Sequence, residues 1–202
     1  VASVTPTLSN LNSGVDPNRV GWNLLGNPFA TALDWDHASW NRNASVDATV
    51  AVWSSSANNY IYWNGSTGDL TDGIIPSRQA FFVKVNSSSP APAITIPAEA
   101  RVVSASPYYK EGSTGYMRLG VTSLGNGYRD AIFTGLNASA TEGFDNQFDV
   151  WKLYGGADAP QLFIPLGESE FSINTLPQVP ATGEMQLGFQ SGVNGEFMIE
   201  AS

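Results

Sequence analysis

Apolar and polar residues alternate with a period of two along most of this chain. In one stretch Met117, Leu119 and Val121 alternate with tyrosine, arginine and glycine. Successive side chains of a strand point to opposite faces of a sheet, so this alternation predicts β-strands. The period of 3.6 residues that is typical of amphipathic helices is hard to find anywhere. We expect at most a short helical turn, near Asp36–Trp40 or Ser139–Phe144.

Short strands are predicted between turn signals rich in glycine, proline and asparagine, such as Gly26-Asn27-Pro28. The apolar run Gln79–Val85 is continuous rather than alternating, which predicts a strand buried on both faces. The other predicted strands are Val20–Leu25, Thr49–Trp53, Tyr60–Trp63, Ile94–Ile96, Tyr116–Thr122, Ala131–Thr134, Val150–Tyr154, Gln161–Ile164, Phe171–Ile173, Met185–Phe189 and Phe197–Ile199.

The spacing of these strands, about ten residues apart, predicts an all-β fold of two stacked β-sandwich lobes. We expect the lobes to be jelly-roll-like and mostly antiparallel. Asn86–Pro92 is the most linker-like segment, and a second loop is expected at Tyr109–Gly115. We divide the chain into an N-terminal lobe at residues 1–103, which carries an aromatic-rich hairpin, and a C-terminal lobe at residues 104–202. A single jelly roll is the alternative.

The composition narrows the classes of partner. The 202 residues include 20 glycines and 12 prolines but no cysteine, and the formal net charge is −9. A surface this negative repels phosphate groups, so we expect no nucleic-acid binding. No apolar run approaches the length of a membrane span, so we expect no membrane insertion. Neutral glycans, cations and other proteins remain. The absence of cysteine excludes disulfides, thiolate nucleophiles and cysteine-ligated metals.

Patterns for catalysis or metal binding are weak. His37 is the only histidine, so a Ser-His-Asp triad would have to use it, and nothing near it resembles a nucleophile elbow. We expect His37 at the surface or in a turn. Glu168 and Glu170 are the nearest pair of carboxylates for an all-β glycosidase, but a loop position explains them more simply. Asp145 and Asp149 are weak candidates for calcium, with turn hydrogen bonds as the simpler explanation. We therefore expect no catalytic residues and no cofactor, with structural calcium as the weaker alternative.

Aromatic residues offer the best functional lead. A hairpin is predicted from the strands Thr49–Trp53 and Tyr60–Trp63, with Ser54–Asn59 as its turn. The aromatic side chains that face outward on this hairpin would form an exposed row. The apolar face of a sugar ring packs on such flat rings, while nearby asparagine and aspartate side chains bond its hydroxyl groups. The predicted carbohydrate-binding residues are Trp40, Trp53, Tyr60, Tyr62, Trp63 and Asn64.

The alternative is that these rings belong to the core. Trp53 and Trp63 fit core and surface equally well, and the two tyrosines of the hairpin also fit cross-strand packing. Trp40 lies in a polar loop and is the tryptophan most expected to be exposed. The tryptophans expected in the core are Trp22, Trp35 and Trp151.

The order of several short motifs resembles a module of proteins that Bacteroidota export through the type IX secretion system. In those proteins the module lies just upstream of the C-terminal sorting domain. The resemblance covers roughly residues 20–200, and its motifs gain specificity from their joint order. The motifs are Gly21–Phe29 with Ala32–Trp35, Val50–Trp53, Tyr60–Asn64, Ile75-Pro76 with Gln79–Val83, Met117–Leu119, Gly143–Asp145 with Asp149, Phe171–Asn174 and Leu187–Phe189.

This resemblance implies a secreted or cell-surface, non-catalytic β module within a larger protein. We expect it to bind polysaccharide or a cell-surface glycan, or to mediate adhesion, beside the other domains of its parent protein. A structural spacer next to a sorting or catalytic domain is the alternative, and an all-β glycoside hydrolase is a third hypothesis. The beginning of the chain lacks the charged-then-apolar pattern of a signal peptide, so we expect a mature or trimmed piece.

Overall fold

The computed structural model describes residues 2–9, 20–87, 90–103 and 116–202. The chain divides into two compact units. Unit 1 comprises Val1–Val52 and Tyr62–Glu111, and unit 2 comprises Trp53–Ile61 and Gly112–Ser202. The expected division after residue 103 and the expected loop at Tyr109–Gly115 fall on residues 104–115, outside the described part of the chain. The tip of the predicted aromatic hairpin therefore groups with the C-terminal residues rather than with the N-terminal ones.

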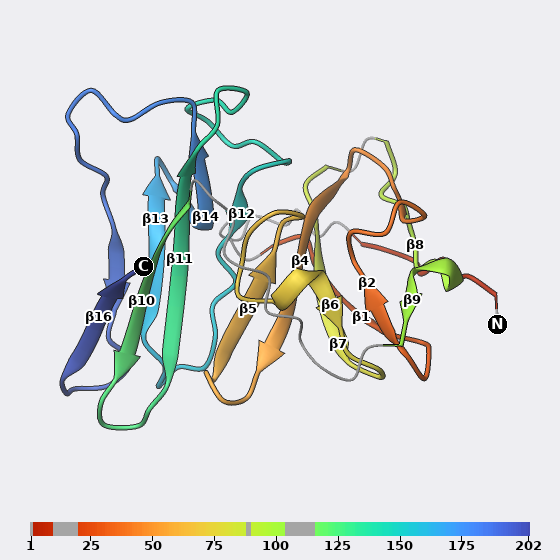
Figure 1. The fold of residues 1–202 in the computed structure, drawn as a ribbon, viewed down its shortest axis with the longest axis horizontal. Coiled ribbons are helices and arrows are strands. Elements are labelled where there is room, and N and C mark those ends of the chain that lie inside the picture. Colours follow the sequence, from red (N-terminus) through yellow and green to blue (C-terminus); the bar gives the residue numbers. More distant parts are fainter. Residues whose placement is uncertain (1, 10–19, 88–89, 104–115) are drawn as a thin grey trace. The chain divides into compact units, whose positions relative to one another are not determined.

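Nearly all regular structure is β, and the prediction of an all-β, mostly antiparallel fold is confirmed (Figure 1). Within the described residues the only helices are two 3-10 turns, Thr71–Gly73 and Ala98–Ala100. Neither lies where a helical turn was expected, because Asp36–Trp40 and Ser139–Phe144 form turns and irregular loops instead. No helix among the described residues is long and apolar enough to cross a membrane.

Unit 1 contains most of a four-stranded sheet of order β1-β7-β4-β5, a three-stranded sheet of order β6-β2-β9 and the pair β3-β8. The end of β4 and the first three residues of β5 belong to unit 2. The strand pairs described by register are antiparallel. The strands are β1 (Trp22–Gly26), β2 (Ala32–Asp34), β3 (Asn41–Arg42), β4 (Val46–Ser54), β5 (Asn59–Trp63), β6 (Ile74–Ile75), β7 (Ala80–Val85), β8 (Ile94–Thr95) and β9 (Arg101–Val102).

Strand β7 runs between β1 and β4 and supplies much of the core of unit 1. Phe81 and Val83 on one face are fully buried, and Lys84 on the other face is also buried. On that second face Ala80 is exposed and Phe82 is half-buried, so the prediction of a strand buried on both faces holds fully for one face and only in part for the other. Gly21 allows β1 to begin close against it. Its φ is +80°, and a Cβ there would lie 2.2 Å from the carbonyl oxygen of Val85.

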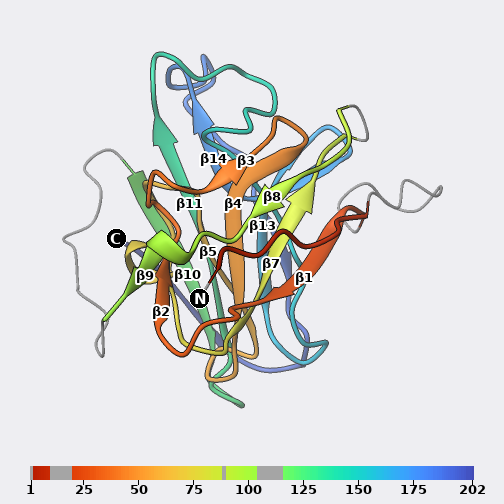
Figure 2. The same cartoon turned by 90° about the vertical axis from the view of Figure 1, so that its right-hand side faces the viewer.

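Unit 2 contains one sheet of order β15-β13-β14-β11-β10-β16, and β12 also pairs with β14. The pair β11-β14 is parallel and the others are antiparallel. Figures 1 and 2 show β10 and β11 side by side in two orientations. The strands are β10 (Tyr116–Ser123), β11 (Arg129–Leu136), β12 (Val150–Trp151), β13 (Gln161–Leu166), β14 (Ser169–Leu176), β15 (Gly188–Gln190) and β16 (Phe197–Ala201).

The sheet of unit 2 is curled. Phe189 belongs to β15 and Phe197 to β16, at opposite ends of the strand order, yet their ring centroids are 5.3 Å apart. The two edges of the sheet must therefore approach each other around the core. The core cluster consists of Val121, Ile132, Leu162, Ile164 and Phe171, with Leu119, Phe144, Trp151, Met185 and Phe197 packed against it.

Each strand predicted from alternation overlaps an observed strand. The missed strands are β2, β3, β6 and β9, which are too short to show a period. Of the three tryptophans expected in the core, Trp35 is buried and Trp151 packs against the core cluster. Trp22 is only half-buried.

Candidate functional site

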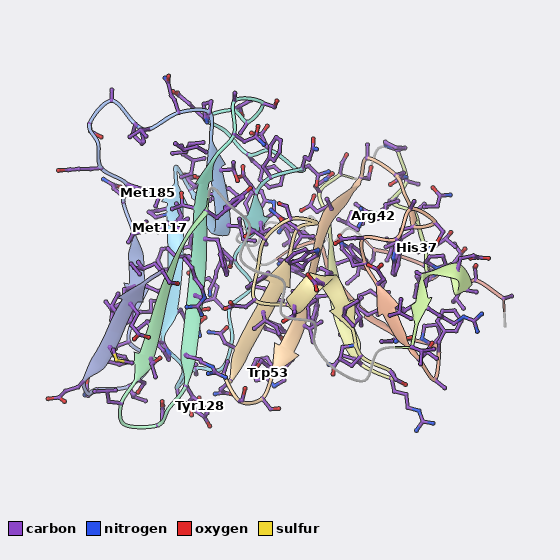
Figure 3. The ribbon with its side chains drawn as sticks, viewed as in Figure 1. His37, Arg42, Trp53, Met117, Tyr128 and Met185 are labelled. Carbon is purple, nitrogen blue, oxygen red and sulfur yellow. The ribbon has the colours of Figure 1, made fainter. Side chains whose placement is uncertain are left out.

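A pocket of about 390 Å³ opens on unit 1 where β2 leads into β3. Two aromatic rings, a guanidinium group, a carboxylate and an imidazole meet at it. Figure 3 labels His37 and Arg42, which lie close together in unit 1. All of its lining residues belong to unit 1, and they are Trp35, Asp36, His37, Ala38, Trp40, Arg42, Ala48, Asn64 and Gly65.

The chain from β2 to β3 is shaped by short-range hydrogen bonds. The Asp34 carboxylate accepts the backbone N–H of Asp36 at 2.9 Å, an Asx turn that starts the loop. The backbone N–H of Trp40 then donates to the His37 carbonyl at 3.2 Å. These consecutive turns place the side chains of Asp36, His37 and Trp40 around one hollow instead of along a strand.

Aromatic rings in tilted and edge-on contact form the apolar wall of the pocket. The ring centroids of Trp35 and Trp40 lie 4.6 Å apart, and Phe81 meets Trp40 edge-on at 6.4 Å. Both indole N–H groups are occupied: Trp35 donates to the Ala48 carbonyl and Trp40 to the Asp34 carbonyl, each at 2.7 Å. The rings are therefore fixed in orientation, and Trp40, which is half-buried, presents apolar surface to the pocket.

The Asp36 carboxylate accepts a hydrogen bond from a buried tryptophan. The indole N–H of Trp63 lies 3.0 Å from both carboxylate oxygens of Asp36. Gly73 makes room for this ring, because a Cβ at Gly73, whose φ is +64°, would lie 2.7 Å from Trp63 Cδ1. The exposed carboxylate of Asp36 thus has a defined position at the pocket.

Arg42 supplies the cationic group. Its Cζ lies 4.5 Å from the centroid of the Trp35 ring, and its Nη1 donates to the Ala48 carbonyl at 3.4 Å. Burial lowers the pKa of Arg42, and the nearby Asp36 carboxylate raises it. An arginine stays protonated under such conditions, so the pocket contains one fixed positive and one fixed negative group.

His37 and Asn64 complete the polar lining. The backbone N–H of Ser39 donates to His37 Nδ1 at 3.2 Å. Because a backbone N–H can only donate, Nδ1 is an acceptor, and the proton of the neutral ring lies on Nε2. The side-chain oxygen of Asn64 accepts the backbone N–H of Thr67 at 2.8 Å. That oxygen is therefore engaged in shaping the next turn.

The six predicted carbohydrate-binding residues fall into three groups, one at the pocket, one on the hairpin tip and one in the core. Trp40 and Asn64 line the pocket in unit 1. Trp53 and Tyr60, on the hairpin tip that belongs to unit 2, form an edge-on pair with centroids 5.0 Å apart. Trp53 is 37% exposed and Tyr60 is half-buried. Figure 3 labels Trp53 on its strand.

The prediction of one exposed aromatic row is wrong, because Tyr62 and Trp63 are buried. The segment after β5 folds back on the strand, where the backbone N–H of Leu70 donates to the Tyr62 carbonyl at 3.0 Å. Sequence alternation describes the strand alone and does not show which later segment covers it.

Several pocket residues were not among the predicted site residues. His37 was expected only as a surface or turn residue, and it is half-buried between two turns. Asp36 and Arg42 were not predicted as binding residues. The sequence does contain a signal for them, because Asp36 and His37 lie between Trp35 and Trp40, and Arg42 follows two residues later.

No protein-family model, no curated protein and no solved structure matches this chain. The resemblance to the type IX secretion module therefore stays a prediction. The geometry of the pocket is the main guide to function.

The other candidate acids lie in unit 2 and have hydrogen-bond partners of their own. Glu168 is exposed in a turn, while Glu170 accepts the hydroxyl of Tyr154 at 2.6 Å. Asp149 accepts the backbone N–H groups of Asp145 and Thr175, both at 2.8 Å. Burial raises the pKa of Asp149 to about 6, although these hydrogen bonds act to lower it. Within the described residues no three acidic or histidine side chains cluster as a metal site would require.

Proposed function

We propose that this chain is a non-catalytic, carbohydrate-binding module of a larger exported protein, and that the Trp40 pocket holds the sugar. The observation that carries this proposal is the juxtaposition of a fixed indole with charged and amide groups in one hollow. Small-molecule sites commonly combine an apolar wall with a few convergent polar groups in roughly 300–1,000 Å³.

The chemistry of the lining suits a sugar ring. The C–H groups on one face of a pyranose would pack against Trp40, whose own N–H is already occupied. Asp36 offers two acceptor oxygens, and Arg42 offers donors, so vicinal hydroxyl groups find complementary partners. With a volume of about 390 Å³, the pocket suits the end of a glycan or a short segment better than a long chain.

A neutral glycan is the proposed ligand class. Asp36 offsets the charge of Arg42, and the whole chain carries a formal net charge of −9. The negative electrostatic potential of the chain would repel a polyanionic glycan. Secretion to the cell surface, type IX export and attachment to other domains of a parent protein belong to the same proposal. The motif resemblance is their only support.

The test is retention on insoluble cellulose, chitin and xylan, followed by titration with soluble fragments of whichever polymer retains the protein. Trp40→Ala should weaken binding by about 2 kcal/mol, more than tenfold, as loss of a central aromatic contact does. Arg42→Gln should weaken it less, because it keeps donors but loses the charge. The melting temperature of each variant shows whether unit 1 remains folded.

Trp53→Ala is the matched control, since it removes an exposed tryptophan from unit 2. It should leave retention unchanged. Loss of retention in Trp53→Ala but not in Trp40→Ala would assign binding to the Trp53–Tyr60 pair and overturn the pocket. Tyr62→Ala is a poor test because Tyr62 is buried, and its loss would destabilise unit 1.

A structural spacer is the second candidate. The burial of Tyr62 and Trp63 favours it, because two of the predicted binding aromatics serve packing instead. A folded protein that no polysaccharide retains, and that shows no heat of binding with soluble neutral oligosaccharides, would favour the spacer.

A further inference from the structure

The core of unit 2 contains a lysine in direct contact with an aspartate. Lys152 follows β12, and Asp130 lies on β11. Their side chains are 0% and 1% exposed, and Lys152 Nζ donates a hydrogen bond to Asp130 Oδ2. Lys152 is held in place by its own backbone N–H, which donates to the Glu170 carbonyl at 2.8 Å.

An ammonium group is a poor fit to this position. It has three N–H donors, and each needs an acceptor when water is excluded. Within the described residues, Asp130 Oδ2 is the only acceptor in hydrogen-bonding distance of Lys152 Nζ. An amide bond between the two side chains would remove both buried charges and leave the nitrogen with one N–H instead of three.

The carboxyl group is held beside the lysine by the backbone. Asp130 Oδ2 accepts the backbone N–H of Leu162 at 2.7 Å, and the backbone N–H of Ala131 bonds the same carboxyl group. These bonds fix the position of the carboxyl carbon next to Lys152 Nζ.

We propose that Lys152 and Asp130 are joined by an intramolecular isopeptide bond, which makes this pair a covalent modification site of unit 2. A proton first passes from the Lys152 ammonium to Asp130 Oδ2, giving an amine and a carboxylic acid. The Nζ lone pair then attacks Cγ, and the Nζ–Cγ bond forms. A second proton leaves Nζ for Oδ2, the Cγ–Oδ2 bond breaks, and one water departs. Nothing is oxidised or reduced.

The surroundings favour the first step. Burial raises the pKa of Asp130, while Lys152 and the backbone N–H groups act to lower it. Burial thus favours the protonated carboxyl group that the attack on Cγ requires. The two oxygens and three protons of the pair are sufficient for the balance, and no other side chain has to supply or accept a proton.

The experiment is an intact-mass measurement on the purified, denatured wild-type chain. The expected mass is lower than the sequence mass by one water. A proteolytic digest should contain a branched peptide in which the Lys152 and Asp130 segments are joined. The full sequence mass, with both segments recovered as separate linear peptides, would overturn the proposal and leave a simple ion pair.

Two variants exclude other sources of water loss, such as cyclisation at a different aspartate. Lys152→Arg keeps the positive charge and should restore the full sequence mass. Asp130→Asn keeps the shape and, if it reacts, should lose ammonia instead of water. Persistence of the lighter mass in Lys152→Arg would contradict the proposal. The wild-type measurement does not depend on either variant folding.

Discussion

Among the described residues each unit buries one lysine, and the two lysines differ in what surrounds them. In unit 1, Lys84 Nζ donates to the Val20 carbonyl at 3.0 Å and lies 5.3 Å from the centroid of the Trp22 ring. Asp47 interacts with it electrostatically. Lys84 is thus an ammonium with several partners, whereas Lys152 in unit 2 meets only Asp130 among the described residues.

The two aspartates differ as well. Asp47 accepts the side-chain amide of Asn86 at 2.6 Å, so it keeps a partner that is independent of Lys84. Asp130 is bonded by backbone N–H groups that no substitution of a side chain removes. Two buried lysines can therefore differ in the partners that compensate their charge. The number of acceptors around the ammonium group distinguishes Lys84, with several partners, from Lys152, whose ammonium group has Asp130 as its acceptor among the described residues.

The largest effect is expected from Lys152→Met. It leaves Asp130 buried without its lysine and removes the proposed cross-link, so unit 2 should lose about 3–5 kcal/mol of unfolding free energy. Hydrogen exchange, read by mass spectrometry on peptides from residues 116–202, measures the loss within unit 2. The double variant Lys152→Met with Asp130→Leu should recover part of it. A loss below that of Lys84→Met would contradict the comparison.

A smaller effect is expected from pH in unit 1. Burial raises the pKa of Asp47 to about 6, although Asn86 and Lys84 act to lower it. A raised folded-state pKa means that the folded state binds more protons between pH ~4 and ~6, so this group adds stability as pH falls. From pH 7 to pH 4.5 the gain is about 2 kcal/mol.

Asp47→Asn tests that contribution. The variant should be more stable than wild type at pH 7, and the difference should shrink towards pH 4.5. Urea unfolding at both pH values, combined with hydrogen exchange on peptides of unit 1, measures it. Equal pH dependence in the variant and the wild type would show that Asp47 titrates normally.

The smallest effect is expected from Lys84→Met, at about 1–2 kcal/mol. Asp47 keeps its bond to Asn86 and can take up a proton, so little charge is left uncompensated. The Val20 carbonyl loses one donor. Urea unfolding at pH 7 measures the change, and a loss as large as that of Lys152→Met would mean that the two lysines are equivalent.

Alternation along the sequence was sufficient to predict the β fold and the positions of the longer strands, because it directly records which side chains face a core. It also placed Lys152 on the same strand face as Val150, which is fully buried. A charged lysine normally faces solvent, so residue type alone predicts an outward position for Lys152. The alternation of the sequence therefore indicated its burial, while its residue type indicated the opposite.

The candidate site was only partly predictable. Trp40 and Asn64 were found because an aromatic ring in a polar loop and an Asn-Gly turn are local features. The burial of Trp63 depends on Gly73 and on the return of the chain after β5, which are long-range features. The same holds for the meeting of Asp36 and Arg42 at one hollow.

The pairing of β10 with β16 has a consequence for biogenesis. Leu119 pairs with Ala201, so this edge of the sheet of unit 2 stays open until Phe197–Ala201 have emerged from the ribosome. Contacts between such distant segments slow folding, and an unpaired strand edge invites association with other chains. A nascent chain stalled before residue 197 should therefore aggregate readily or recruit chaperones.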